Sequence, residues 1–247
     1  MTRSGGVLGK ADMHLHTLYS DGTASVQAVL DHVEAHTDLD AMAITDHERI
    51  DGALRAREIH AGGEYSFDLV VGEEITTRRG HVLALFITER IPALRPLPET
   101  LERIHDQGGI AIAPHPMAPL TPSLGARSLL AAHRATDPRH RLDAIELMNP
   151  SAAGRARRTA RDGLNAEVLR LAAVGNSDAH VLESVGSGWT WFPGSTAADY
   201  RGAVEQGTTQ PDGRFWSNLH NVDVYRRQLR AKVRHLRHTL RPTGEWR

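Results

Sequence analysis

Short apolar runs alternate with amphipathic segments along this 247-residue chain, and this alternation limits the possible fold more than any other feature. The predicted strands are residues 11–16, 39–47, 67–76, 80–87, 108–116, 142–149, 172–180 and 188–193. They are nearly continuous apolar runs, as expected of strands that are covered on both faces. Strands that alternate with helices favour a parallel sheet. The sequence therefore predicts an α/β fold, a closed or nearly closed β/α barrel, with a doubly wound open sheet as the alternative.

Helices are predicted between most of these strands. The clearest is 25–37, where apolar residues fall on one face and Ser25 is placed to cap the N-terminus. Further helices are predicted at 50–60, 98–107, 123–134, 155–173 and 197–206. No linker or low-complexity segment divides the chain, so we expect one β/α barrel over residues 1–217, followed by a basic amphipathic helix and tail over 218–247.

The expected C-terminal helix has two unlike faces. Its apolar stripe is Val222, Tyr225, Leu229, Val233, Leu236 and Leu240, and its basic face is Arg226, Arg227, Arg230, Lys232, Arg234, Arg237 and Arg241. The simplest interpretation is a helix that docks on the barrel with its basic face in solvent. Contact with a second copy of the chain, with an acidic membrane or with nucleic acid stays open.

Composition excludes several classes of site. The chain has no cysteine, so disulfides, thiolate metal sites and cysteine nucleophiles are impossible. The net charge of -1 gives no overall attraction to nucleic acid. The first residues lack the apolar core of a signal peptide, and no run approaches the ~20 apolar residues of a membrane span. The expected location is therefore the cytoplasm.

Residues of metal-binding types stand at the boundaries of most predicted strands. His14 and His16 close the first strand, and residues two apart on a strand point to the same side. Later boundaries carry His47, Glu74, His81, His115, Asp178 and His180. In β/α folds the C-terminal ends of the strands surround the active site. The pair His14 and His16 alone would fit ordinary histidines equally well, but the whole series favours a metal site.

The segments HLHTLYSDG, TDH, GEE, HVLAL, APHP and NSDAH, in this order, resemble the motifs of the PHP (polymerase and histidinol phosphatase) family. The resemblance extends from about Asp12 to Pro193. It implies a distorted (β/α)7 barrel with up to three metal ions at the C-terminal ends of the strands. It also implies a metal-dependent phosphoesterase.

The resemblance further implies a ligand set. A first metal would take His14, His16, Glu74 and Asp178; a second would share Glu74 and add His81 and His115; a third would take Asp21, His47 and His180. Gly72-Glu73-Glu74 matches the family's G-x-E pattern, so Glu74 is the expected ligand and Glu73 is expected to face the other way. Histidine and carboxylate ligands favour two to three ions of manganese, zinc or iron.

Clustered divalent ions neutralise a phosphate ester and lower the pKa of a bound water to about 7. We therefore expect metal-bound hydroxide to attack phosphorus in a small phosphorylated metabolite, either a monoester or a diester. The candidate catalytic residues are Asp46 and Arg158, and Arg155 and Arg158 are the candidate substrate-binding residues. Asp46 and Asp12 are also candidates for orienting imidazoles. A solvated basic helix would explain the arginines without any role in binding.

Three other functions remain open at this point. The site could act on short nucleic acid ends guided by the basic C-terminal helix. It could be a metallohydrolase for a substrate without phosphate, because bridged metal ions serve both chemistries. It could also be a metal-dependent binding protein without turnover.

Overall fold

The computed structural model describes residues 7–119 and 121–239. The strands are β1 (Leu8–Asp12), β2 (Ala41–Ile44), β3 (Asp68–Thr77), β4 (Gly80–Leu85), β5 (Ile110–Ala113), β6 (Ala144–Met148), β7 (Ala172–Gly175), β8 (Gly188–Pro193) and β9 (Gln210–Gly213). The helices are α1 (Val26–His36), α2 (Asp51–Gly62), α3 (Leu97–Asp106), α4 (Ala126–His133), α5 (Ala152–Arg155), α6 (Arg158–Leu164), α7 (Ala197–Gln206) and α8 (Asn218–Thr239). All eight predicted strands are present, and β9 is an additional one.

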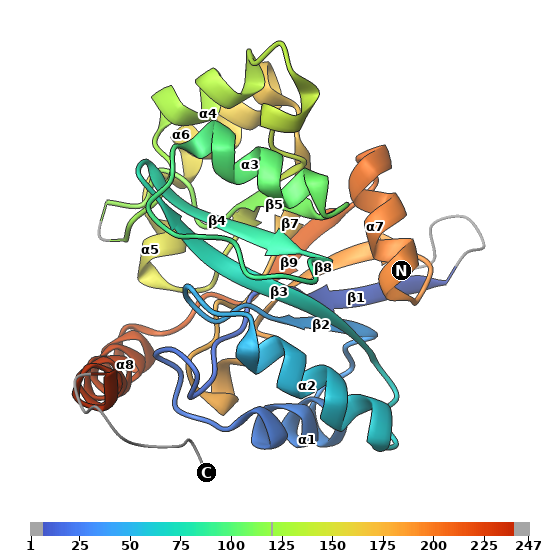
Figure 1. The fold of residues 1–247 in the computed structure, drawn as a ribbon, viewed down its shortest axis with the longest axis vertical. Helices are drawn as coiled ribbons and strands as arrows, with labels where there is room; N and C mark the ends of the chain where they lie inside the picture. The colour runs from blue at the N-terminus through green and yellow to red at the C-terminus, as the bar shows by residue number, and fades with distance from the viewer. Residues whose placement is uncertain (1–6, 120, 240–247) are drawn as a thin grey trace.

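The strands form one sheet in the order β7-β6-β5-β4-β3-β2-β1-β8-β9. Helices α1 and α2 cover one side of it, and α3, α4 and α6 lie on the opposite side (Figure 1). One apolar cluster packs these helices against the sheet, and a second fills the space between the strands and α7. The predicted α/β barrel is therefore confirmed.

The sheet nearly closes on itself beside the predicted metal site. Beyond the ends of β1 and β7, Leu15 pairs with Ala179 in parallel orientation, and the Ala179 carbonyl accepts a 2.9 Å hydrogen bond from the His16 amide. Gly175 allows β7 to approach β8 closely, because a Cβ atom at this position would lie only 2.4 Å from the Trp189 carbonyl oxygen. The Thr190 hydroxyl joins the two strands by donating to the Gly175 carbonyl at 2.8 Å.

The prediction of a parallel sheet is wrong in part. Strand β4 is antiparallel to both β3 and β5, and β8 is antiparallel to both β1 and β9. Only Arg78 and Arg79 separate β3 from β4, and so short a connection can join only antiparallel strands. The other neighbouring pairs are parallel, as predicted.

The predicted helix over residues 155–173 is broken in the structure. Arg157 adopts a left-handed conformation (φ 54°) between α5 and α6, and a π-helical turn, Asn165–Leu169, follows α6. Because a left-handed residue cannot continue a right-handed helix, the chain changes direction at Arg157.

Helix α8 docks through a different face from the one predicted. Val222, Tyr225 and Leu229 of the predicted stripe are more than half exposed, whereas Val224 and Ala231 are buried. Val224 packs with Val181 and Trp216 in a small apolar cluster. The burial of Leu236 falls outside the described part of the chain, as do Leu240 and Arg241 altogether. In the part of the chain described here, no helix has the length and apolar character needed to cross a membrane.

Glu73 lies on the opposite face of β3 from Glu74, as expected. Its side chain is fully buried and accepts a 3.0 Å hydrogen bond from the Ile91 amide. Burial raises the pKa of Glu73 from 4.5 to about 7. The folded protein therefore holds a proton at Glu73 that the unfolded chain has already released between these two pH values.

We predict that Glu73→Gln stabilises the protein at pH 8 more than at pH 5. The raised pKa makes the contribution of Glu73 to stability fall as the pH rises from about 4.5 through about 7. The glutamine cannot ionise. The unfolding free energy of the variant relative to the unaltered protein should therefore rise by about 3 kcal/mol at most across that interval. Urea unfolding of both proteins at the two pH values measures the difference. An equal difference at pH 5 and pH 8 would contradict the prediction.

Candidate metal centre

Nine histidine, aspartate and glutamate side chains converge at one end of the barrel. They form four overlapping groups whose donor atoms lie within 4.8 Å of one another. The nine are His14, His16, Asp21, His47, Glu74, His81, His115, Asp178 and His180. These are the nine positions predicted as ligands, so the structure brings the entire predicted set together.

His14, His16 and Asp178 form one of these groups, and Glu74 lies beside both of its histidines. The Nε2 atom of His14 lies 3.1 Å from Glu74 Oε2 and 3.3 Å from Asp178 Oδ1, and the Nε2 atom of His16 lies 3.2 Å and 3.3 Å from the same oxygens. A tetrahedral ion bound at ~2.0–2.1 Å needs donors about 3.3 Å apart. The four histidine–carboxylate separations are therefore close to the distance between neighbouring ligands of such an ion.

The second group uses the other oxygen of Glu74. Glu74 Oε1 lies 2.7 Å from His81 Nδ1 and 3.1 Å from His115 Nε2. Because its two oxygens face different donor groups, Glu74 has the position of a bridging carboxylate between two adjacent ions. His81 is the second residue of β4 and comes directly after the turn that joins β3 to β4.

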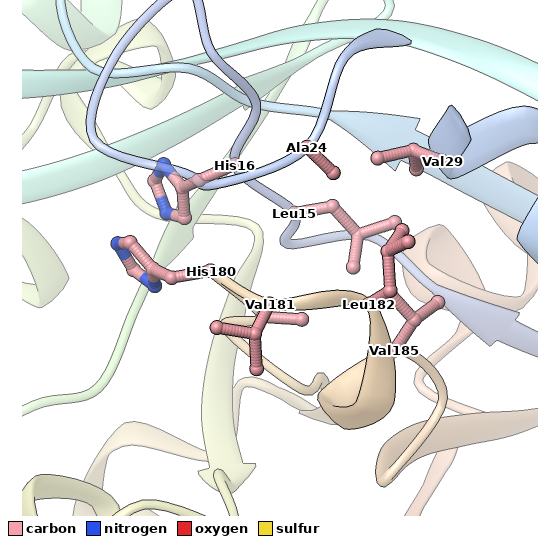
Figure 2. A pocket seen from close by; sticks show the side chains of 9 residues that line it. Leu15, His16, Ala24, Val29, His180, Val181, Leu182 and Val185 are labelled. Carbon is pink, nitrogen blue, oxygen red and sulfur yellow. The ribbon is translucent and has the colours of Figure 1, made fainter. Parts of the chain in front are cut away.

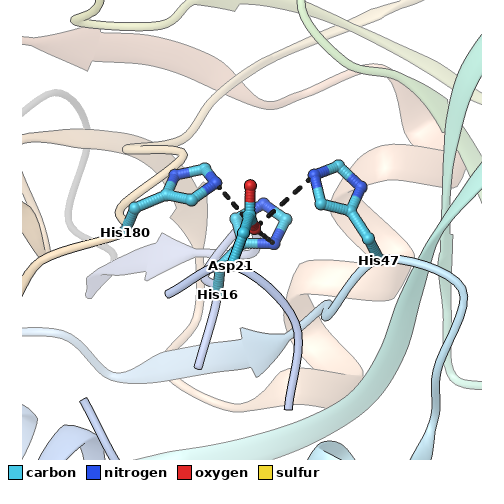
Figure 3. A group of neighbouring side chains, drawn as sticks. All are labelled: His16, Asp21, His47 and His180. Atoms are coloured by element: carbon cyan, nitrogen blue, oxygen red, sulfur yellow. Dashed lines mark ion pairs between the residues drawn. The ribbon is translucent and has the colours of Figure 1, made fainter. Parts of the chain in front are cut away.

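The third group surrounds Asp21 in the loop between β1 and α1 (Figure 3). Asp21 Oδ1 lies 3.1 Å from His180 Nε2 and 3.8 Å from both His47 Nε2 and His16 Nδ1. The resemblance implied three ligands here, and the structure adds His16, whose ring stacks on that of His180 at 4.1 Å. The two ring nitrogens of His16 thus face two different groups.

The backbone is unusual at two of the donors. His115 and Asp178 have φ angles of 59° and 54°, in the left-handed region that residues other than glycine seldom adopt. Such conformations cost of order 1–3 kcal/mol and occur preferentially at functional sites. At His115 the ring is held by Ser123, whose hydroxyl lies 3.0 Å from Nδ1.

Several nitrogen atoms of the cluster are buried without a hydrogen bond, and bound cations would provide partners for them. Both ring nitrogens of His16, together with His81 Nδ1 and His180 Nε2, are buried without a partner in hydrogen-bond geometry within the described chain. A buried polar atom of this kind costs about 1–3 kcal/mol. Histidine nitrogens and carboxylate oxygens are donors that zinc, manganese and iron(II) accept. The residues present therefore fit a cluster of divalent metal ions.

The electrostatic environment favours ionised carboxylates. Burial opposes the charged form of Glu74, but the imidazoles of His47, His81 and His14 hold its pKa well below the usual range. At Asp21, burial is likewise outweighed by His180 and His47, which hold the pKa of this carboxyl low. Burial lowers the pKa of His47 to about 3. Burial also opposes the charged form of His16, but Asp178 and Glu74 raise the pKa of this ring to about 10, so metal binding to His16 must displace a proton.

Glu146 is a functional residue that the sequence analysis missed. Its Oε1 lies 3.3 Å from His14 Nδ1, and it accepts hydrogen bonds from Asn149 at 3.0 Å and from Asn176 at 2.9 Å. A carboxylate that accepts from Nδ1 leaves the Nε2 lone pair of His14 facing Glu74 and Asp178. The available signal was a carboxylate inside the otherwise apolar strand β6.

Asp46 and Asp12 organise loops. Asp46 accepts hydrogen bonds from the Thr17 amide (2.7 Å), the Thr17 hydroxyl (2.6 Å) and the Ser20 hydroxyl (2.6 Å). It thus fixes the loop that carries Asp21, rather than the ring of an imidazole. Asp12 accepts from the Ser177 and Gly186 amides, both at 2.9 Å, and so fixes the segment that carries Asp178.

Arg155 and Arg158 gather around an aromatic ring. Their guanidinium carbons lie 4.9 Å and 5.4 Å from the centre of the Phe215 ring. Arg155 donates to the Trp216 carbonyl at 2.8 Å, and Arg158 forms a 3.4 Å pair with Asp162. Both follow β6 at the end of the barrel that holds the cluster, and their role in binding substrate stays a prediction.

An apolar wall backs the third group. The pocket in Figure 2 is lined by Leu15, Ala24, Val29, Val181, Leu182 and Val185 behind the rings of His16 and His180. It leaves no room for a water-sized sphere. Water therefore does not reach these rings from behind, which strengthens electrostatic interactions on their polar side.

Comparison with known sequences identifies relatives of this chain. A family model described as PHP-associated matches residues 154–209. An uncharacterised protein of Methanocaldococcus jannaschii is 36% identical over 129 residues, which are 48% of this chain and 74% of that protein. A phosphoribosyl 1,2-cyclic phosphate 1,2-diphosphodiesterase of Eggerthella lenta is 34% identical over 101 residues, which are 38% of this chain and 37% of that enzyme.

Solved structures share the fold. A two-domain protein of Bacteroides vulgatus, described as containing a predicted PHP-like metal-dependent phosphoesterase, matches with a TM-score of 0.68 and 19% identity, over 92% of this chain and 71% of its own. PsfC of Pseudomonas syringae matches with a TM-score of 0.60 and 21% identity, over 94% and 99%. At these identities the structures support the fold alone. The PHP-associated family model over residues 154–209 identifies the chain as a member of the PHP family, and the shared fold agrees with this assignment.

Proposed function

We propose that this protein hydrolyses a phosphate ester of a small metabolite, with two or three divalent ions held by the nine clustered donors. The observation that carries this proposal is the position of Glu74. Its two oxygens face separate donor groups at 2.7–3.3 Å, as a carboxylate that bridges two ions must. The sequence similarity to a phosphodiesterase that acts on a cyclic phosphate supports the same chemistry.

Bound divalent ions would neutralise the charge of the ester and polarise its phosphoryl oxygens. The protein contributes the arrangement. Glu146 sets which nitrogen of His14 faces the cluster, Asp46 and Asp12 fix the loops that carry Asp21 and Asp178, and the apolar wall keeps water from the rear. With the donors held in advance, little reorganisation is needed when the substrate binds.

We predict that His14→Ala and Asp178→Asn each abolish phosphoesterase activity. Loss of a direct ligand should exceed the about 10–100-fold effect of losing an outer contact. The assay follows hydrolysis of an aryl phosphate monoester, an aryl phosphate diester and a cyclic ribose phosphate with manganese, zinc or iron(II). His133→Ala, which removes an exposed histidine at the end of α4, serves as the matched control. Variants that retain full activity would show that the cluster is not the active site.

Glu146→Gln should weaken metal binding by about 10–100-fold without unfolding the protein. The change removes the negative charge next to His14 Nδ1 and nearly preserves the side-chain volume. Metal content after dialysis against a graded chelator measures the loss. Glu73→Gln is the control, because Glu73 is an equally buried carboxylate that bonds the Ile91 amide instead. Equal metal retention in both variants would show that Glu146 does not support metal binding.

A second candidate function is hydrolysis at nucleic acid ends, favoured by one observation. Helix α8 carries six lysine or arginine residues and one aspartate, and Gln228 of this helix contacts Asp21 in the cluster. A basic helix beside a phosphoesterase centre is placed to hold a phosphate backbone.

If nucleic acid is the substrate, reversing the charge of exposed Arg226 and Arg230 to glutamate should lower its hydrolysis several-fold and flatten its salt dependence. Turnover of a small aryl phosphate should not change. The comparison uses a short single strand at several salt concentrations, with the double variant Arg55→Glu and Arg57→Glu on α2 as a charge-matched control. If the unaltered protein hydrolyses the nucleic acid at a rate that does not depend on salt, this function is rejected. A small metabolite then remains as the proposed substrate.

A further inference from the structure

Helix α8 reaches the metal-binding cluster through one side chain. Gln228 donates a hydrogen bond from Nε2 to Asp21 Oδ2 at 3.0 Å, across 207 positions of sequence. The other oxygen of Asp21, Oδ1, is the one that lies 3.1 Å from His180 Nε2. The amide of Gln228 thus occupies one oxygen of Asp21 while the other faces the imidazoles.

Neighbouring contacts fix Gln228 in this position. Val224 and Ala231, one turn before and one turn after it, are buried. One turn before Val224, the Asn221 side chain accepts a hydrogen bond from the Ala152 amide at 2.8 Å. The residues 221, 224, 228 and 231 follow a spacing of three and four and so lie on one face of α8. Gln228 is the polar member in the middle of this docked face.

The chemistry of this contact is that of an outer partner of a metal ligand. A carboxylate can rotate, and a neutral amide donor on one oxygen restrains it without competing for a cation. Outer partners of this kind orient ligands and alter metal affinity. The groups around Glu74 are built without α8 and share only His16 and His47 with the Asp21 group, so an effect of Gln228 should be largest in the group that contains Asp21.

We propose that Gln228 is a positioning residue for Asp21, through which the C-terminal helix completes the donor group of Asp21, His16, His47 and His180. This inference rests on the proposed metal-dependent function. It also explains why the buried face of α8 differs from its apolar stripe: the helix is oriented to bring an amide to Asp21, and the stripe remains exposed.

The test is a cobalt(II) titration of the full chain after removal of metal by chelation, followed by calorimetry and by visible absorption, which reports cobalt coordination. Asp21→Asn first identifies the binding step that belongs to the Asp21 group. We expect Gln228→Ala to weaken that step by about 10–100-fold and to affect the remaining steps much less. Gln228→Leu should behave likewise, because it keeps most of the side-chain volume but removes the donor without adding charge.

The control is Arg227→Ala, which removes the 3.2 Å pair with Glu183 from the same helix without touching Asp21. It should bind cobalt as the unaltered protein does, with circular dichroism confirming that all variants are folded. Unaltered cobalt binding in both Gln228 variants would overturn the inference, as would an equal loss in Arg227→Ala. If the unaltered protein binds no cobalt at all, the metal centre itself fails and this inference fails with it.

Discussion

The site depends on a buried carboxylate that imidazoles surround on all sides. Glu74 is almost inaccessible to solvent, and five histidine rings place a nitrogen within 3.3 Å of one of its oxygens. An isolated carboxylate in such a place would be strongly destabilising. The surrounding rings therefore have to keep Glu74 ionised, and the same rings provide the remaining donors for metal ions. Removing Glu74 would take away the shared member of the groups as well as their electrostatic balance.

The barrel produces this arrangement at the point where its sheet closes. The segments that follow β1 and β7 pair through Leu15 and Ala179, which brings His14 and His16 next to Asp178 and His180. Asp12 extends the connection, because it accepts from the Ser177 amide in the loop that carries Asp178. The pairing that closes the sheet therefore also places the donor residues side by side. For this reason donors more than 160 positions apart in sequence have separations close to 3.3 Å.

Much of the fold could be predicted from the sequence, because strand–helix alternation is a local signal. Strand boundaries pointed to eight of the nine clustered residues and the resemblance to the PHP family added Asp21, while their binding of metal stays a prediction. What could not be predicted depends on tertiary packing. Glu146 stands in the middle of a strand, and its role becomes visible only when His14 lies beside it. The docked face of α8 was predicted wrongly because the apolar stripe is the stronger local pattern, whereas the barrel offers Asp21 and a small apolar cluster as partners. The antiparallel β4 follows from the two-residue connection, a signal that strand–helix alternation obscured.

The charge of the donor set connects the structure to an anionic substrate. The set contains three carboxylates, Asp21, Glu74 and Asp178, and the pKa of each is held low by neighbouring imidazoles against the effect of burial. The carboxylates in turn raise the pKa values of His14, His16 and His115 against the effect of burial, so bound metal ions would displace protons from these rings. With the imidazoles neutral, two divalent ions would exceed the three negative charges by one positive charge. A third ion would increase this excess by two. Because uncompensated charge is costly in a site walled by apolar residues, the loaded centre would favour a ligand with negative charge, and a phosphate ester has it at the atoms that must approach the ions.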